Sequence, residues 1–166
     1  VDRLNVTAEK FGLGKKVLGE YFDNEKKGLF PNTKWKKNNL GRGWVLGETL
    51  ITGIGQGYIQ STPLQLCLMT AQIANGGYAI KPKIIVDNNQ ISYEDAKQSM
   101  ESGLLFDSNS DSLLDKKLFK NKKNIKIIQD AMFASTNERF GTSYKSRIED
   151  LKYQFAGKTG TAQVKK

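Results

Sequence analysis

Residues 157–163 are the most informative stretch of the chain, and their sequence is Gly157-Lys158-Thr159-Gly160-Thr161-Ala162-Gln163. The stretch combines a cation, hydroxyl groups and glycine, and we expect it to be extended. Because side chains alternate along a strand, Thr159 and Thr161 would face one way, and Lys158 and Gly160 the other. Exposed N–H groups can bind a substrate carbonyl, while a hydroxyl and an ammonium suit a carboxylate. Taken alone, these residues also fit an ordinary strand end with a turn glycine.

A glycine-rich turn at residues 53–57 is followed by a strong signal for the start of a helix. Thr62 can cap the helix, Pro63 suits its first position, and Gln65 is compatible with a capping box. The predicted helix runs on to Asn75-Gly76-Gly77, and we expect it to be buried because it is apolar around most of its circumference. The turn lacks the ending of a phosphate-binding loop, which favours a structural role.

The remaining segments carry weaker patterns. Apolar residues recur at helical spacing in two of them, whereas charged and glycine-rich segments indicate surface connections. The elements expected are helices at residues 3–11 and 124–138, an extended connection with short strands at residues 15–43, strands at Lys83–Val86 and Tyr153–Val164, and a polar surface insertion at residues 88–123.

Composition limits the possible functions. The 166 residues, 38% hydrophobic and 26% charged, suit one soluble domain, and no apolar run approaches a membrane span. The net charge of +9 comes from scattered lysine pairs such as Lys36-Lys37, which predicts a solvated lysine-rich surface rather than nucleic-acid binding. With one cysteine, Cys67, and no histidine, the chain cannot form an internal disulfide, a cysteine–histidine metal site or a histidine-dependent catalytic triad. We therefore expect no metal and no cofactor.

Lys-Thr-Gly is the third motif of the penicillin-recognising serine enzymes, and further signatures of one such family stand upstream in the family's order. They are Trp44-Val45-Leu46-Gly47-Glu48-Thr49 (the family has Gly-Asp-Thr), Gly53-Ile54-Gly55-Gln56-Gly57 with Thr62-Pro63-Leu64-Gln65, Ala74-Asn75-Gly76-Gly77 with Lys81-Pro82, and Gly141-Thr142-Ser143 (the family has Gly-Thr-Ala). Together they resemble the class B penicillin-binding proteins over nearly the whole chain, and most closely the penicillin-binding protein 2 group of the elongation machinery.

The resemblance implies an α/β (mixed α+β) fold, the penicillin-binding and β-lactamase-like transpeptidase fold, in which helices flank an antiparallel sheet. Residues 1–166 would form a partial transpeptidase domain, incomplete at both ends. It also implies a peptidoglycan D,D-transpeptidase that cross-links stem peptides and binds β-lactams, with elongation proteins as partners. The parent protein would sit in the cytoplasmic membrane, anchored outside this chain, with this domain on the periplasmic side.

Carried over to this sequence, the family's third motif assigns roles to four residues. Lys158 would supply positive potential for the substrate carboxylate and for proton movement, and Thr161 would give one backbone N–H to the oxyanion hole. The hydroxyls of Thr159 and Thr161 would bind the carboxylate, and Gly160 would allow close approach.

Two motifs of the family are missing from the sequence. No serine has a lysine three residues later, so the nucleophile motif Ser-x-x-Lys is absent. Ser135-Thr136-Asn137 matches the second motif, Ser-x-Asn, in letters alone, because in the family that motif precedes all the segments present here. We therefore expect the chain by itself to be inactive. Two alternatives remain: a class D β-lactamase-like or sensor domain, and a non-catalytic basic binding module.

Overall fold

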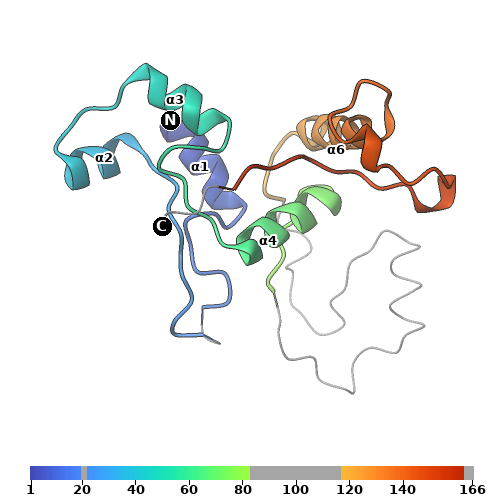
Figure 1. Ribbon diagram of the computed structural model, residues 1–166. Helices are drawn as coiled ribbons and strands as arrows, with labels where there is room; N and C mark the ends of the chain where they lie inside the picture. The colour runs from blue at the N-terminus through green and yellow to red at the C-terminus, as the bar shows by residue number, and fades with distance from the viewer. Residues whose placement is uncertain (20–21, 83–116, 163–166) are drawn as a thin grey trace, which may run out of the picture. The chain divides into compact units, whose positions relative to one another are not determined.

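The computed structural model describes residues 1–19, 22–82 and 117–162 (Figure 1). The chain divides into two compact units, Val1–Leu118 and Phe119–Lys166. The first unit contains the helices α1 (Asp2–Lys10), α2 (Thr33–Leu40), α3 (Leu46–Gly53) and α4 (Pro63–Ala74). The second contains α6 (Lys122–Asn137) and two 3₁₀ turns, η2 (Tyr144–Ser146) and η3 (Leu151–Tyr153). Within the described residues, no helix is both long and apolar enough to span a membrane.

Helix α1 confirms the helix predicted at residues 3–11. Its buried face carries Ala8 and the polar Asn5, and Phe11 is buried just after its end. The Asn5 amide donates to the Phe30 carbonyl at 2.8 Å, and Asp2 accepts hydrogen bonds from both the backbone N–H and the hydroxyl of Thr33. Polar side chains therefore attach α1 to the segment that leads into α2.

Helix α4 begins and ends as its sequence predicts. The Thr62 hydroxyl accepts from the Gln65 N–H at 3.2 Å, and the Thr62 N–H donates back to the Gln65 side chain at 3.0 Å, forming a capping box. At the other end, Asn75 Oδ1 accepts from the backbone N–H groups of Gly77 and Tyr78. The helix is not buried all round within this chain, because Leu66 is 45% exposed and Cys67 is also exposed.

The buried side of α4 is held by glutamines. Gln65 is fully buried, and its Nε2 donates to the carbonyls of Lys15 and Lys27 at 2.7 and 2.8 Å. Gln72, also buried, donates to the Phe11 carbonyl at 3.1 Å. Since an unpaired carbonyl inside a protein is costly, these amides let otherwise irregular segments pack against α4.

Helix α2 corrects the sequence-based prediction, and α3 forms where no element was predicted. An extended connection was expected at residues 15–43, but residues 33–40 form α2, which Asn32 caps by accepting from the Trp35 N–H at 2.7 Å. Gly41 ends α2 in the left-handed conformation with φ +65°. Both helices are only eight residues long. Apolar periodicity is hard to recognise over so short a stretch, and capping chemistry fixes these helices instead.

The antiparallel sheet remains a prediction. Pairing within the described residues is limited to two isolated bridges, Leu29 with Gln60 and Tyr78 with Lys117. The strand predicted at Lys83–Val86 lies outside the described residues. The strand predicted from Tyr153 is wrong as far as residue 162, because a 3₁₀ turn ends at Tyr153 and irregular backbone follows. A strand needs a neighbour for its backbone hydrogen bonds, and the described residues supply none for this segment.

The second unit is built on α6, which confirms the helix predicted at residues 124–138. After the helix ends, the chain turns back sharply at Gly141. A Cβ atom on Gly141 would lie 2.2 Å from the Ser135 carbonyl oxygen, so a side chain would collide with the helix. The Ser143 N–H donates to the same carbonyl at 2.9 Å. The chain therefore wraps the last turn of α6 at Gly141-Thr142-Ser143. The first position of this signature is glycine because a larger residue would collide with the helix.

Candidate functional site

The segment from Lys158 to Thr161 lies exposed on the second unit, outside any helix or strand. The Lys158 ammonium donates to the Thr159 carbonyl at 2.7 Å and to the Thr159 hydroxyl at 3.1 Å. A Cβ atom on Gly160 would meet no atom within 4 Å, so the backbone there is open on that side. The cation, hydroxyls and free backbone predicted from the sequence are therefore accessible together, although the strand geometry is not formed.

The backbone just before this segment is attached to α6. The Gly157 N–H donates to the Met132 carbonyl at 3.0 Å, and Asn137 Nδ2 donates to the Phe155 carbonyl at 2.9 Å. Gly157 also packs closely, because a Cβ atom there would lie 3.1 Å from the Thr136 hydroxyl oxygen. In Figure 1 the red segment after η3 returns past α6. Helix α6 thus determines where the chain enters the Lys158–Thr161 segment.

Ser135, Thr136 and Asn137 form the last turn of α6. The Ser135 hydroxyl lies 3.1 Å from the Thr142 hydroxyl, Thr136 is fully buried, and Asn137 contacts Phe155. These contacts are internal to the second unit. They agree with the interpretation that Ser-x-Asn occurs here by coincidence.

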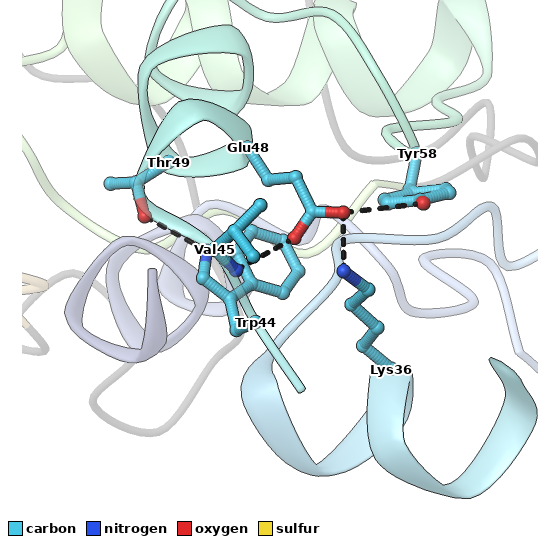
Figure 2. Close-up of polar contacts among 6 residues, drawn as sticks. All are labelled: Lys36, Trp44, Val45, Glu48, Thr49 and Tyr58. Carbon is cyan, nitrogen blue, oxygen red and sulfur yellow. Dashed lines mark hydrogen bonds and ion pairs between the residues drawn. The ribbon is translucent and has the colours of Figure 1, made fainter. Parts of the chain in front are cut away.

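A polar cluster around the buried Lys36 in the first unit was not found by sequence reasoning (Figure 2). Lys36 on α2 is only 4% exposed and forms an ion pair with Glu48 on α3. Its ammonium also lies 5.8 Å from the centre of the Trp44 ring. The expectation that the lysine pairs are solvated is therefore wrong for Lys36. Lys34 and Lys37 stand close to it in the sequence, and the pattern of lysines around it does not distinguish it from an ordinary surface lysine.

Glu48 makes three different contacts in this cluster. Besides the ion pair with Lys36, its carboxylate accepts from the Val45 N–H at 3.0 Å, which caps α3, and from the Tyr58 hydroxyl at 3.3 Å. The hydrogen bond from Lys36, followed by the one from the Val45 N–H, holds the pKa of Glu48 below its usual value of 4.5. Glu48 thereby joins α2, α3 and the turn that follows α3.

Aromatic residues surround the ion pair. The Trp35 and Tyr58 rings lie 5.3 Å apart, and the Trp44 indole N–H donates to the Thr49 hydroxyl at 2.8 Å. Since each polar group drawn in Figure 2 has a partner inside the cluster, the arrangement is suited to structure rather than to ligand binding.

The glycine-rich turn at residues 53–57 also bonds to its own helix. The N–H groups of Gly55 and Gln56 donate to carbonyls of α3 at 3.0 and 3.1 Å, and Gly55 and Gly57 have φ near +80°. Left-handed backbone of this kind favours glycine. Because those two N–H groups are used within the turn, the geometry agrees with the predicted structural role rather than with a phosphate site.

Comparisons with known proteins converge on one family. The family model described as "Penicillin binding protein transpeptidase domain" matches residues 1–166. The peptidoglycan D,D-transpeptidase MrdA of Acinetobacter baumannii is 30% identical over 99% of this chain and 22% of its own length.

Solved structures agree with this match. PBP2 of Helicobacter pylori, in a complex with MreC, is 31% identical with a TM-score of 0.73, over 99% of this chain and 26% of that one. PBP2 of Pseudomonas aeruginosa, in complex with WCK 5153, is 32% identical with a TM-score of 0.63, over 87% of this chain and 29% of that one. The chain thus spans roughly a quarter of the length of the relatives it matches.

Proposed function

Because the chain belongs to the penicillin-binding protein transpeptidase domain family, we propose that it is part of a longer serine D,D-transpeptidase that cross-links peptidoglycan stem peptides. The observation that carries the proposal is the exposed segment Lys158-Thr159-Gly160-Thr161, in a chain whose family match runs from end to end. The ordered upstream signatures support it, since the first unit uses several of them to build its own structure.

The proposed reaction proceeds through an acyl-enzyme. A serine elsewhere in the longer protein attacks the carbonyl between the two terminal D-alanines of a stem peptide, and the bond to the last D-alanine breaks. That D-alanine leaves after taking up a proton on its nitrogen. An amine from a second stem peptide then attacks the acyl-serine, forms the new amide, and releases the serine with its proton restored.

The residues of this chain bind and polarise the substrate in that scheme. The Lys158 ammonium attracts the terminal carboxylate, and the hydroxyls of Thr159 and Thr161 donate hydrogen bonds to it. The Thr161 backbone N–H stabilises the oxyanion together with the N–H of the attacking serine. Open space beside Gly160 supports these roles, because a substrate has to lie close to the backbone there.

The relatives also suggest location and partners. The Helicobacter pylori PBP2 structure is a complex with MreC. We therefore propose proteins of the cell-wall elongation machinery as partners of the longer protein, and peptidoglycan stem peptides and β-lactams as its ligands. This domain would work on the periplasmic side of the cytoplasmic membrane.

Two measurements test the proposal. Sequencing the coding DNA upstream of Val1 should show a reading frame containing Ser-x-x-Lys and then Ser-x-Asn. The longer protein should form a stable adduct with a fluorescent penicillin on a denaturing gel, whereas the 166-residue chain should remain unlabelled.

Each measurement has an outcome that contradicts the proposal. Labelling of the short chain would mean that it contains its own nucleophile. Rapid release of hydrolysed penicillin by the longer protein would instead indicate the β-lactamase alternative. An upstream frame without Ser-x-x-Lys would remove the transpeptidase assignment.

A further inference from the structure

Within the described residues, the Lys158–Thr161 segment makes few contacts of its own. Its side chains are exposed, its backbone pairs with no strand among those residues, and its lysine bonds to the adjacent threonine. Within this chain, the residues that lead into the segment attach it to the rest of the second unit. In the second unit those residues are Phe155 and Gly157, and both are attached to the last two turns of α6.

Asn137 connects the helix to this segment. Its Nδ2 donates to the Phe133 carbonyl one turn earlier at 3.0 Å and to the Phe155 carbonyl at 2.9 Å. The two N–H groups of one amide thus bond to the helix and to the incoming chain at once. An aspartate has the same shape but, when ionised, has no N–H to donate to either carbonyl.

A second contact keeps the incoming backbone close to the helix. Gly157 donates to the Met132 carbonyl at 3.0 Å, and it lies so near Thr136 that a Cβ atom would be 3.1 Å from the hydroxyl oxygen. Phe155 and Gly157 are therefore both fixed, and Lys158 follows directly. A change at Asn137 would reach the exposed segment through a single short stretch of backbone.

We propose that Asn137 is a positioning residue for the third motif: by holding the Phe155 carbonyl against the end of α6, it places Lys158, Thr159 and Thr161 where they meet the carboxylate of the substrate. This inference rests on the proposed function. It adds a residue that contacts neither the substrate nor the reacting serine.

The test uses the longer protein and two substitutions at this position. Asn137→Ser keeps a hydroxyl that can bond to the Phe133 carbonyl but is too short to reach Phe155 as well. Asn137→Asp removes both donors. The matched control is Asn39→Asp, because Asn39 also lies in the last turn of a helix and donates to the carbonyl four residues earlier at 2.8 Å, but no second segment depends on it.

The main measurement is the acylation rate by a penicillin and by its methyl ester, which lacks the carboxylate charge. Small displacements of a positioning group can reduce rates by about 10- to 100-fold. We expect both Asn137 variants to lose penicillin acylation on that scale while ester acylation changes much less, so the ratio of the two rates falls. Asn39→Asp should leave the ratio unchanged. A partly unfolded enzyme would lose both rates in proportion, so the ratio separates positioning from stability.

Different outcomes have different consequences. An unchanged rate ratio in both variants would overturn the inference while leaving the proposed function in place. Failure of the unsubstituted protein to react with penicillin at all would remove the proposed function instead.

Amide hydrogen exchange in the longer protein provides a second measurement, one that does not depend on activity. Asn137→Ser should speed exchange at Gly157 and leave α1 unchanged. Unaltered exchange at Gly157 would also contradict the inference.

Discussion

Two lysines show how differently the two units use the same side chain. Lys36 in the first unit is buried, ion-paired with Glu48 and close to an indole ring. Lys158 in the second unit is exposed, and within the part of the chain that the structure describes its ammonium bonds to the threonine beside it. Lys36 has its partners inside the first unit, whereas the polar groups beside Lys158 are open to solvent.

The difference separates residues that we expect to stabilise the fold from residues that we expect to act in the reaction. Thr62, Gln65 and Glu48 satisfy helix ends and loop carbonyls, so their substitution should change stability. Lys158, Thr159 and Thr161 contribute little to packing, so their substitution should change activity. The four predictions that follow test this division, from the largest expected effect to the smallest.

Lys158→Met should reduce penicillin acylation of the longer protein by on the order of 10²–10³-fold, the size of loss found for one preorganised electrostatic group. Its free energy of unfolding should change by less than about 0.5 kcal/mol, as for other exposed sites. Gel-based acylation kinetics and urea unfolding measure the two quantities. Lys152→Met, at another exposed lysine of the same unit, is the control and should affect neither. An unchanged acylation rate in Lys158→Met would show that the Lys158 ammonium takes no part in acylation.

Gln65→Leu should lower the free energy of unfolding of the first unit by about 3 kcal/mol, because carbonyls of two loops lose their donor inside the protein. Residue-resolved hydrogen exchange measures the loss in α4 separately from α6. Gln154→Leu, at an exposed position of the second unit, serves as the control. Equal effects of the two substitutions would mean that the internal hydrogen bonds of Gln65 contribute nothing measurable.

Gly141→Ala should destabilise the second unit by about 1–3 kcal/mol, a typical cost of forcing an extra group into a packed site. The added Cβ would lie 2.2 Å from the Ser135 carbonyl oxygen. Hydrogen exchange of α6 measures the effect. Gly43→Ala is the control, because nothing lies within 4 Å of its Cβ position. A stable alanine variant would show that the turn can move away from the helix.

Glu48→Gln should weaken the acid sensitivity of the first unit. Folding lowers the pKa of Glu48 below 4.5. The ionised carboxylate therefore contributes to the free energy of unfolding above that pH, and this contribution is lost as the pH falls through the pKa of the folded state. The wild-type unit should therefore lose stability below about pH 4.5, and the variant should lose less.

Some acid sensitivity should persist in that variant. The pKa of Asp2 is lowered by hydrogen bonds from Thr33, and that of Glu25 is lowered because backbone hydrogen bonds from Val17, Leu18 and Gly19 outweigh the opposing effect of burial. Chemical unfolding at several pH values measures the difference. Identical pH profiles would exclude a role for the Glu48 carboxylate.

Local chemistry explains which parts of the fold were predictable. Helix α4 carries its start and stop signals within its own sequence, and α1 and α6 have apolar spacing long enough to recognise. The sequence analysis also expected residues 158–161 to offer exposed N–H groups, hydroxyls and an ammonium, and the structure leaves these residues exposed.

The remaining features depend on contacts between distant residues. Lys36 and Glu48 are 12 positions apart, and nothing near Lys36 in the sequence indicates that it is buried. The hydrogen bond from Asn137 to Phe155 spans 18 positions, and no local sequence pattern indicates it. The strand predicted at Tyr153–Val164 is wrong as far as residue 162, since strand formation depends on a neighbour that the local sequence does not specify.

The cluster around Lys36 also has an optical consequence. The chain contains two tryptophans, Trp35 and Trp44, and both lie in the first unit beside this ion pair. Intrinsic indole fluorescence therefore comes from the first unit alone, and the second unit emits no tryptophan signal. An emission spectrum therefore follows the loosening of the α2–α3 contact without any attached dye.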